Sequence, residues 1–252
     1  MGAPRILTID IETAPAVVET WSLHNAYIGI EQVREPGRIL GFGWKWYGQP
    51  KVQWTSIQHG TSAEMIEVAR DILHDADLVI TYNGDSFDLK HLNREIILAG
   101  LTPPSKVKSI DLYRTVKNRF KFQSNKLDFV AQQLGVGAKA STGGYGLWKG
   151  CMEGDPAAWA KMGRYCRQDV RVTEALYDRL RPWIANHPNV ALWADRGTGR
   201  MCPTCGSHLL QQRGLQRTIA AVYVRYQCQG CGSWSRANAM EQRLAGNNRP
   251  AV

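Results

Sequence analysis

The sequence has no apolar run that approaches the roughly 20 residues needed to cross a lipid bilayer. Its first residues also lack the charged, apolar and small-residue order of a secretory signal. We therefore expect a cytoplasmic protein with no membrane partner. Because 44% of the 252 residues are hydrophobic, the chain can form the core of a large α/β domain with a small appendage.

Lysine is absent from the stretch that runs from Asp195 to the C-terminus, and acidic residues are scarce there. This stretch contains eight arginines against Asp195 and Glu241, a net charge of +6, while the whole chain carries +9. Arginine favours forked contacts to phosphate or base edges over diffuse attraction. The charge pattern suits a polyanion, and we expect a nucleic acid partner.

A short apolar segment near the N-terminus ends in two carboxylates. Residues 5–12 read Arg-Ile-Leu-Thr-Ile-Asp-Ile-Glu, which predicts a buried strand. Alternate residues of a strand point to the same face, so Asp10 and Glu12 project together from its end. Two acids at this spacing also occur on exposed strand edges. The continuous apolar run favours a central strand whose paired charges are held by a hard cation.

Hydrophobic periodicity and turn signals predict further strands and helices across the first 185 residues. The expected strands are residues 39–47, 52–57, 77–82 and 107–112. The expected helices are residues 61–74, 87–99, 112–119, 127–134 and 155–183, the last with a weak point at Gly163. We expect a long loop over the strand ends at residues 13–37 and a glycine-rich, flexible connection at residues 135–154.

Both connecting segments leave alternatives open. The aromatic residues of the 13–37 loop either take part in function or pack onto the core. In the 135–154 connection, basic and aromatic residues either stack on and neutralise a single nucleic acid strand or belong to an ordinary surface linker. These residues are Lys139, Tyr145, Trp148 and Lys149.

Two later positions bring further polar side chains to the predicted sheet. The turn at residues 83–86 joins a strand to a helix and places Asp88 in the first helical turn, beyond the carboxyl end of that strand. In open α/β sheets ligands bind at this edge. Tyr165 and Asp169 are four residues apart in the last helix and therefore share one of its faces.

These motifs, in this order, resemble those of DEDD-type 3′-5′ exonucleases in the ribonuclease H-like superfamily. The three matching segments are Asp10-Ile11-Glu12, Asn83-Gly84-Asp85-Ser86-Phe87-Asp88 and Tyr165-Cys166-Arg167-Gln168-Asp169. The tyrosine indicates the DEDDy subgroup, because Arg164 stands where the histidine subgroup has its histidine. The sequence is most similar to the proofreading exonuclease domain of family B DNA polymerases, over residues 5–185, and the remainder is too short for a polymerase domain.

The resemblance implies a pair of Mg²⁺ or Mn²⁺ ions. Phosphodiester hydrolysis builds charge on the attacking and the leaving oxygen, and two hard cations stabilise both. By resemblance, Asp10, Glu12 and Asp169 hold the ion that activates water. Asp10 also bridges to a second ion near Asp88. Tyr165 is implied to orient the attacking water through its hydroxyl group.

The activity implied is release of nucleoside monophosphates from the 3′ end of single-stranded DNA in replication or repair, with a replication protein as an expected partner. An RNA 3′-5′ exonuclease would carry the same acids. A non-catalytic nucleic-acid binding protein is a third alternative, although clustered acids repel phosphate. We predict substrate contacts at Thr13, Asn83 and Phe87, while Asn83 alternatively only stabilises its turn. Asp85, expected to cap the turn, and Asp111 stay outside the predicted metal set.

Two C-x-x-C pairs separated by 22 residues, each followed by glycine, lie in the arginine-rich tail. The four thiols are those of Cys202, Cys205, Cys228 and Cys231. Their spacing predicts one structural Zn²⁺ in a zinc ribbon, with residues 219–227 as a hairpin strand. His208 is a spare ligand that such a site does not need. Disulfides would require an oxidising compartment, and we expect Cys151 and Cys166 to be ordinary buried thiols.

We therefore expect three parts in the chain. Residues 1–190 form an α/β exonuclease domain, with a ribonuclease H-like mixed five-stranded sheet flanked by helices. Residues 195–240 form a zinc ribbon, and residues 241–252 form a flexible tail. The ribbon either grips nucleic acid or recruits a protein. The nucleic-acid alternative depends on Arg213, Arg217, Arg225, Arg236, Tyr223 and Trp234, of which we predict Arg213 and Arg225 as substrate-binding residues.

Overall fold

The computed structural model describes residues 2–24, 27–138, 143–195, 199–219 and 221–240, and the backbone of 242–243. Two compact units emerge, one formed by Arg5–Tyr177 and the other by Met1–Pro4 together with Asp178–Val252. Lys139 and nearly all of the predicted tail lie outside the described residues.

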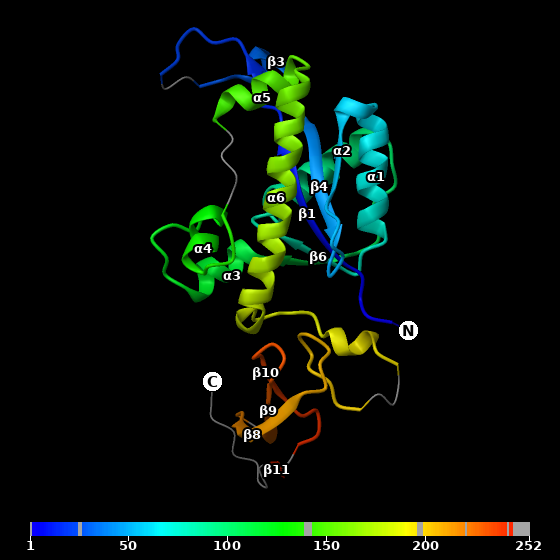
Figure 1. Ribbon diagram of the computed structural model, residues 1–252, viewed down its shortest axis with the longest axis vertical. Helices are drawn as coiled ribbons and strands as arrows, with labels where there is room; N and C mark the ends of the chain where they lie inside the picture. The colour runs from blue at the N-terminus through cyan, green and yellow to red at the C-terminus, as the bar shows by residue number, and fades with distance from the viewer. Residues whose placement is uncertain are drawn as a thin grey trace. The chain divides into compact units, whose positions relative to one another are not determined.

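The larger unit is built on a five-stranded sheet with the order β5-β4-β1-β6-β7 (Figure 1). Its strands are β1 (Ile6–Thr13), β4 (Ile39–Trp46), β5 (Gln53–Ser56), β6 (Leu78–Thr81) and β7 (Lys108–Asp111). β4 runs antiparallel to β1 and β5, whereas β6 and β7 run parallel to β1. The expected mixed sheet is thus confirmed, with β1 at its centre.

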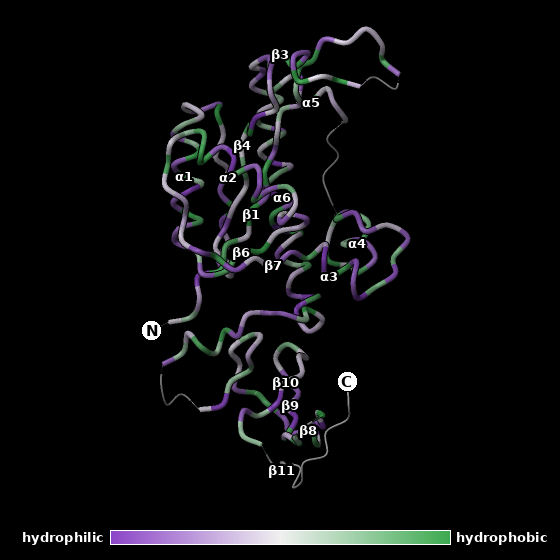
Figure 2. The backbone as a smooth tube through the Cα atoms, turned by 180° about the vertical axis from the view of Figure 1, so that it is seen from behind, coloured by the Kyte–Doolittle hydropathy of each residue, from purple (hydrophilic) through white to green (hydrophobic). Residues whose placement is uncertain are grey.

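Helices cover both faces of this sheet. They are α1 (Ser62–His74), α2 (Asp88–Leu98), α3 (Leu112–Arg119), α4 (Leu127–Gln133), α5 (Tyr145–Met152) and α6 (Pro156–Leu180). One core joins Leu7, Ile9 and Ile11 of β1 to buried side chains of α1 and α2. A second core joins β4 to α5 and α6. The apolar stretches of β1 and β6 that make this packing possible are green in Figure 2.

Three expectations need correction, two for the connecting segments and one for the last helix. Residues 13–37 contain a 3-10 turn (Ile30–Gln32) and a small antiparallel pair, β2 (Val17–Val18) and β3 (Val33–Glu35). Trp21 and Tyr27 are 101% and 92% exposed, so these two aromatic residues do not pack onto the core. The 135–154 segment is not wholly a flexible connection, because α5 occupies part of it. α6 passes through Gly163 without a break, and the absence of a side chain there makes room for the ring of Trp54.

The smaller unit contains a second sheet in which β9 (Ala221–Cys228) is the central strand. β8 (Leu210–Arg217) pairs with one edge of β9, while β10 (Trp234–Arg236) and β11 (Gln242–Arg243) pair with the other. The 3-10 turns Arg181–Trp183 and Val190–Trp193 precede this sheet. Among the described residues, no helix is both long and apolar enough to cross a membrane.

Candidate active site and metal centre

The candidate site begins at the end of β1. The odd-numbered apolar residues of this strand join the core under α1 and α2, and Asp10 and Glu12 occupy the alternate positions. One oxygen of each carboxylate and the sulfur of Cys166 on α6 form a group whose atoms all lie within 4.8 Å of one another. Glu12 is buried, with 7% of its surface exposed. Two carboxylates this close favour a bound cation or a shared proton.

Asp88 reaches the same strand end from the first turn of α2. Its Oδ1 accepts a hydrogen bond from the backbone N–H of Ile11 at 3.0 Å. The residue is 4% exposed, although it stands at a helix start where a carboxylate is usually solvated. Asp88 therefore lies beside the segment that carries Asp10 and Glu12, as its motif predicts, but it is not part of their tight group.

The third motif lies on α6, which packs closely against β4. The N–H of Gly43 donates to the sulfur of Cys166 at 3.0 Å. A Cβ at position 43 would itself meet that sulfur at 3.0 Å, so glycine permits the approach. Asp169 follows one turn after Cys166 and is 1% exposed. Tyr165 is half-buried, and its ring lies 6.4 Å from that of Trp148 on α5.

Cys166 is more than the ordinary buried thiol that we expected. Its S–H donates to the backbone oxygen of Asp10 at 3.3 Å and lies 3.6 Å from Asp10 Oδ2. Burial raises the pKa of this thiol well above its usual value, and the negative charges of Asp10 and Glu12 raise it further. Cys166 is therefore a neutral donor to the β1 carboxylate. Its position between Tyr165 and Asp169 was the only sequence signal for this contact.

A cavity of about 560 Å³ opens beside Asp10. Its lining comes from β1, the β6–α2 turn, α3 and the start of α4. The lining residues are Asp10, Tyr82, Asn83, Tyr113, Asn125, Lys126, Leu127 and Asp128. The Tyr82 hydroxyl donates to the carbonyl of Asn125 at 2.6 Å and its ring stands edge-on to that of Tyr113. The cavity has the size of a small-ligand site and offers aromatic, amide and charged groups.

Of the predicted substrate-binding residues, one lines this cavity and the others lie elsewhere. Asn83 lines this cavity, whereas Thr13 and Phe87 are not among the described residues that do so. Phe87 is partly exposed and packs against the ring of His91, with 4.5 Å between ring centres. Arg213 and Arg225 belong to the smaller unit, at β8 and β9.

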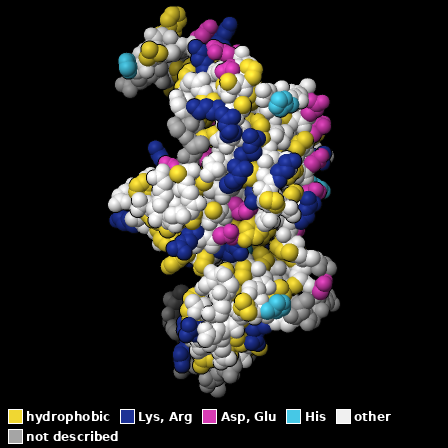
Figure 3. Space-filling model, viewed as in Figure 1, with side chains coloured by type: hydrophobic (Ala, Val, Ile, Leu, Met, Phe, Trp, Pro, Cys, Tyr) yellow, Lys and Arg dark blue, Asp and Glu magenta, His cyan; other side chains and the backbone are white. Residues whose placement is uncertain are grey.

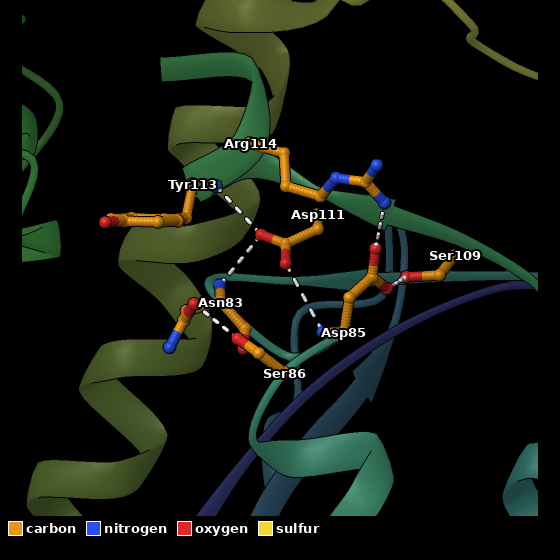
Figure 4. Close-up of polar contacts among 7 residues, drawn as sticks. All are labelled: Asn83, Asp85, Ser86, Ser109, Asp111, Tyr113 and Arg114. Carbon is orange, nitrogen blue, oxygen red and sulfur yellow. Dashed lines mark hydrogen bonds and ion pairs between the residues drawn. The ribbon is translucent and has the colours of Figure 1, made fainter. Parts of the chain in front are cut away.

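Asp111, at the end of β7, holds the β6–α2 turn in place (Figure 4). Its carboxylate accepts hydrogen bonds from the N–H groups of Asn83 at 2.8 Å, Asp85 at 3.3 Å and Tyr113 at 3.0 Å. Burial raises the pKa of Asp111, and the bonds from Asn83 and Asp85 oppose that rise. Asn83 has a φ of 70°, a left-handed conformation that needs such support. Sequence reasoning missed this role.

Asp85 contributes to the same turn through its side chain. It accepts from the hydroxyl of Ser109 at 2.5 Å and from Arg114 Nη1 at 2.8 Å (Figure 4). These bonds tie the turn to β7 and α3. Among the described residues, neither Asp85 nor Asp111 joins a metal-ligand group.

The four tail cysteines gather in the smaller unit. The sulfurs of Cys202 and Cys231 are 3.7 Å apart, and those of Cys205 and Cys228 are 3.6 Å apart. A tetrahedral zinc ion with Zn–S bonds of about 2.3 Å would separate its sulfurs by about 3.8 Å, whereas a disulfide needs about 2.05 Å. The four thiols therefore fit a tetrahedral metal ion and are consistent with a zinc ribbon.

Backbone amides support this group of thiols. The N–H of Thr204 donates to the sulfur of Cys202 at 3.4 Å. Burial raises the pKa of Cys202 and Cys205. In Cys228 hydrogen bonds from the N–H groups of Cys231 and Gly230, together with those from the thiols of Cys205 and Cys202, outweigh burial and lower the pKa to about 7. Such donors favour the thiolate that a metal ion requires. His208, the predicted spare, bonds instead to the carbonyl of Arg200.

Comparison with known proteins adds two similarities. A family model described as the RNase_H superfamily matches residues 26–181, a span that contains Asp88 and Asp169 and begins after Asp10 and Glu12. The family B DNA polymerase from the hyperthermophilic archaeon Pyrobaculum calidifontis is similar in structure, with a TM-score of 0.56 and 19% identity over 89% of this chain. The match covers 34% of that polymerase, and at this identity it concerns the fold alone. No curated protein matches the sequence.

Proposed function

The chain belongs to the ribonuclease H superfamily, and from this premise we propose that it is a metal-dependent 3′-5′ exonuclease of the DEDDy kind. The substrate is single-stranded DNA, and the products are nucleoside monophosphates. One observation carries the proposal: Asp10 and Glu12 converge at the end of the central strand, where Asp88 is bonded to the intervening Ile11. Carboxylates concentrated at one buried strand end suit hydrolysis of a phosphodiester better than simple binding of one.

The carboxylates of the three motifs fit hard divalent cations. Asp10, Glu12, Asp88 and Asp169 would hold them, because carboxylate oxygens are the ligands that Mg²⁺ and Mn²⁺ prefer. Once bound, two such ions would stabilise charge on the attacking and leaving oxygens.

The remaining groups position the reactants. The hydroxyl of Tyr165, one turn before Asp169 on the same helix face, orients the attacking water. The thiol of Cys166 bonds to Asp10 and so fixes the strand end against α6. The cavity beside Asp10 accepts the terminal nucleotide, with Asn83 and Lys126 as polar contacts along its wall.

The outer surface of α6 suits a polyanionic substrate. Lys161, Arg164 and Arg171 are exposed and recur at helical spacing, and Figure 3 shows Lys and Arg side chains gathered over this helix. Positive charge in this position attracts a phosphate backbone without reading its sequence. The proposal places this activity in cytoplasmic DNA replication or repair, with a structural Zn²⁺ at the four cysteines and a replication protein as partner.

Digestion of end-labelled oligonucleotides tests the proposed function. With a 5′ label and added Mg²⁺ or Mn²⁺, single-stranded DNA should shorten one nucleotide at a time, and a 3′ label should appear at once as mononucleotide. EDTA should abolish both signals. Internal cleavage would refute the exonuclease assignment, and preference for RNA of the same sequence would refute the choice of DNA. If the wild type and Asp10→Ala were equally inactive, a non-catalytic binding protein would be favoured.

Asp111→Ala should lower the hydrolysis rate by about 10- to 100-fold, because a misplaced supporting group commonly costs this much. The variant removes the acceptor shared by the amides of Asn83, Asp85 and Tyr113. The rate at saturating metal and the melting temperature should be measured together.

Asp77→Ala is the matched control for Asp111→Ala. Asp77 Oδ2 accepts a hydrogen bond from the N–H of Arg5 at 2.7 Å. Like Asp111, it is an aspartate beside a strand of this sheet whose carboxylate binds a backbone amide. It lies at the opposite end of β6 from the site. An activity loss of equal size in both variants would show that Asp111 acts only through stability.

A further inference from the structure

β8, β9 and β10 lie together in the sheet of the smaller unit (Figure 1). One face of this sheet carries both aromatic residues and arginines. In the antiparallel register, Trp234 is paired with Gln227 and Arg236 with Arg225. Directly paired residues share a face, and so do alternate residues of one strand, which adds Tyr223 to this set. We call Tyr223, Arg225, Trp234 and Arg236 the ribbon face.

The side chains of the ribbon face are stacked in pairs. The guanidinium of Arg225 lies 4.6 Å from the ring centre of Trp234, and that of Arg236 lies 4.2 Å from the ring centre of Tyr223. Arg225 Nε also donates to the carbonyl of Arg213 at 3.0 Å, which fixes its plane. Trp234 is nevertheless 51% exposed. An exposed ring held in place by a guanidinium is a platform on which a further planar group can stack.

The charged side chains of the segment that carries this sheet are of one sign. Residues 199–240 contain five arginines and no lysine, aspartate or glutamate. A zinc ion with four thiolates carries about −2, so the segment would retain about +3. Gln211 and Gln216 of β8 extend the ribbon face through their pairing with Gln227 and Tyr223, and they add neutral hydrogen-bonding groups.

We propose that the ribbon face is a second binding surface, and that its partner is a single strand of DNA bound without regard to sequence. Unpaired bases would stack on the rings and guanidinium planes, while the arginines meet the phosphates. A duplex hides its base faces and is excluded as the preferred partner. The choice of DNA over RNA rests on the proposed function, but the binding itself does not require hydrolysis.

Fluorescence anisotropy with labelled oligonucleotides tests this surface, in the full chain carrying Glu12→Gln so that the probe is not digested. Trp234→Ala should weaken binding to single-stranded oligo-dT by about 5- to 100-fold, the range seen when one stacking aromatic is removed. Arg225→Ala should reduce the salt dependence of binding by about 0.7 in the log–log slope, as expected for one lost phosphate contact on a single strand. Duplex DNA should bind more weakly than oligo-dT.

Arg217→Ala is the matched control, because it removes the same charge from the same sheet. Arg217 pairs with Val222, which places it on the opposite face from Tyr223 and Arg225. It should change affinity less than Arg225→Ala. Equal losses in the two variants, or unchanged binding in Trp234→Ala, would overturn the proposal in favour of diffuse charge or a protein partner. Tighter binding of RNA would overturn the choice of DNA.

Two further measurements separate misfolding and the proposed function from this inference. Each variant should retain one zinc ion, and Trp234→Phe should recover most of the affinity because it restores a flat ring. Wild-type hydrolysis of the p-nitrophenyl ester of thymidine 5′-monophosphate reports on the carboxylate site alone. If the protein binds oligo-dT but hydrolyses nothing, the proposed exonuclease activity is rejected and the proposed binding by the ribbon face stands. If it hydrolyses the ester but Trp234→Ala binds as tightly as the parent chain, the binding proposal is rejected and the exonuclease activity stands.

Discussion

Replacing Glu12 with glutamine should lower the rate of DNA hydrolysis by at least about 1,000-fold, because a cation ligand underlies several kcal/mol of transition-state stabilisation. The substitution keeps the size of the side chain and removes its charge. Glu12 is buried and shares a group of ligand atoms with Asp10. The rate should be measured on single-stranded DNA at saturating Mg²⁺.

The same variant should be more stable than the wild type when no divalent cation is present. The wild type holds two carboxylates at short range, and their repulsion opposes folding. Relief of about 1 kcal/mol would raise the melting temperature by about 2–4 °C. Adding Mn²⁺ should then stabilise the wild type, by about 2.7 kcal/mol at 100 times its dissociation constant, and should stabilise Glu12→Gln much less.

Glu67→Gln is the control for the two effects expected of Glu12→Gln, the lower hydrolysis rate and the higher stability without metal. Glu67 is exposed on α1, and its substitution removes the same charge from the same unit. It should leave the rate, the metal-free melting temperature and the Mn²⁺ response unchanged. If Glu12→Gln instead destabilised the metal-free protein and kept the Mn²⁺ response, Glu12 would be a structural acid with no cation to hold.

The parts that sequence predicts well are those whose signal is local. β1 could be placed from its own apolar run, and the mixed sheet followed from the family whose motifs the chain carries. Likewise the spacing of the two cysteine pairs predicts a metal site, and the four thiols do lie close together. Residues 145–152 were missed because glycines in this segment suggested a loop. Tertiary packing of Leu147 and Cys151 outweighs that local preference, since both are buried on α5.

The parts that sequence predicts poorly depend on contacts between distant segments. Asp111 bonds amides 26 and 28 residues earlier in the chain, and nothing in its own neighbourhood indicates this. Cys166 meets Gly43, 123 residues away, through a fit that only the packed helix and strand define. The ribbon face likewise follows from strand pairing, because sequence alone did not show that Arg217 and Arg225 lie on opposite faces of the sheet.

Removal of the metal ion from the four cysteines should unfold the β8–β10 sheet and leave the larger unit folded. Apparent binding free energies of structural zinc reach about 10–16 kcal/mol. Few buried apolar side chains hold this sheet together, since nearly all of β8 is exposed. Hydrogen exchange should therefore show lost protection across residues 210–236 after chelation, with protection retained in β1, β4 and β6.

Cys228→Ser should reproduce the effect of the chelator, whereas Cys151→Ser serves as its control. Both thiols are buried, but Cys151 lies on α5 and belongs to no group of metal ligands among the described residues. The purified wild type and Cys151→Ser should each contain one zinc ion per chain, and Cys228→Ser should contain none. Protection of β9 that survives both chelation and Cys228→Ser would mean that the hairpin folds by itself. In that case the sulfur distances near 3.7 Å would reflect side-chain packing rather than a metal site.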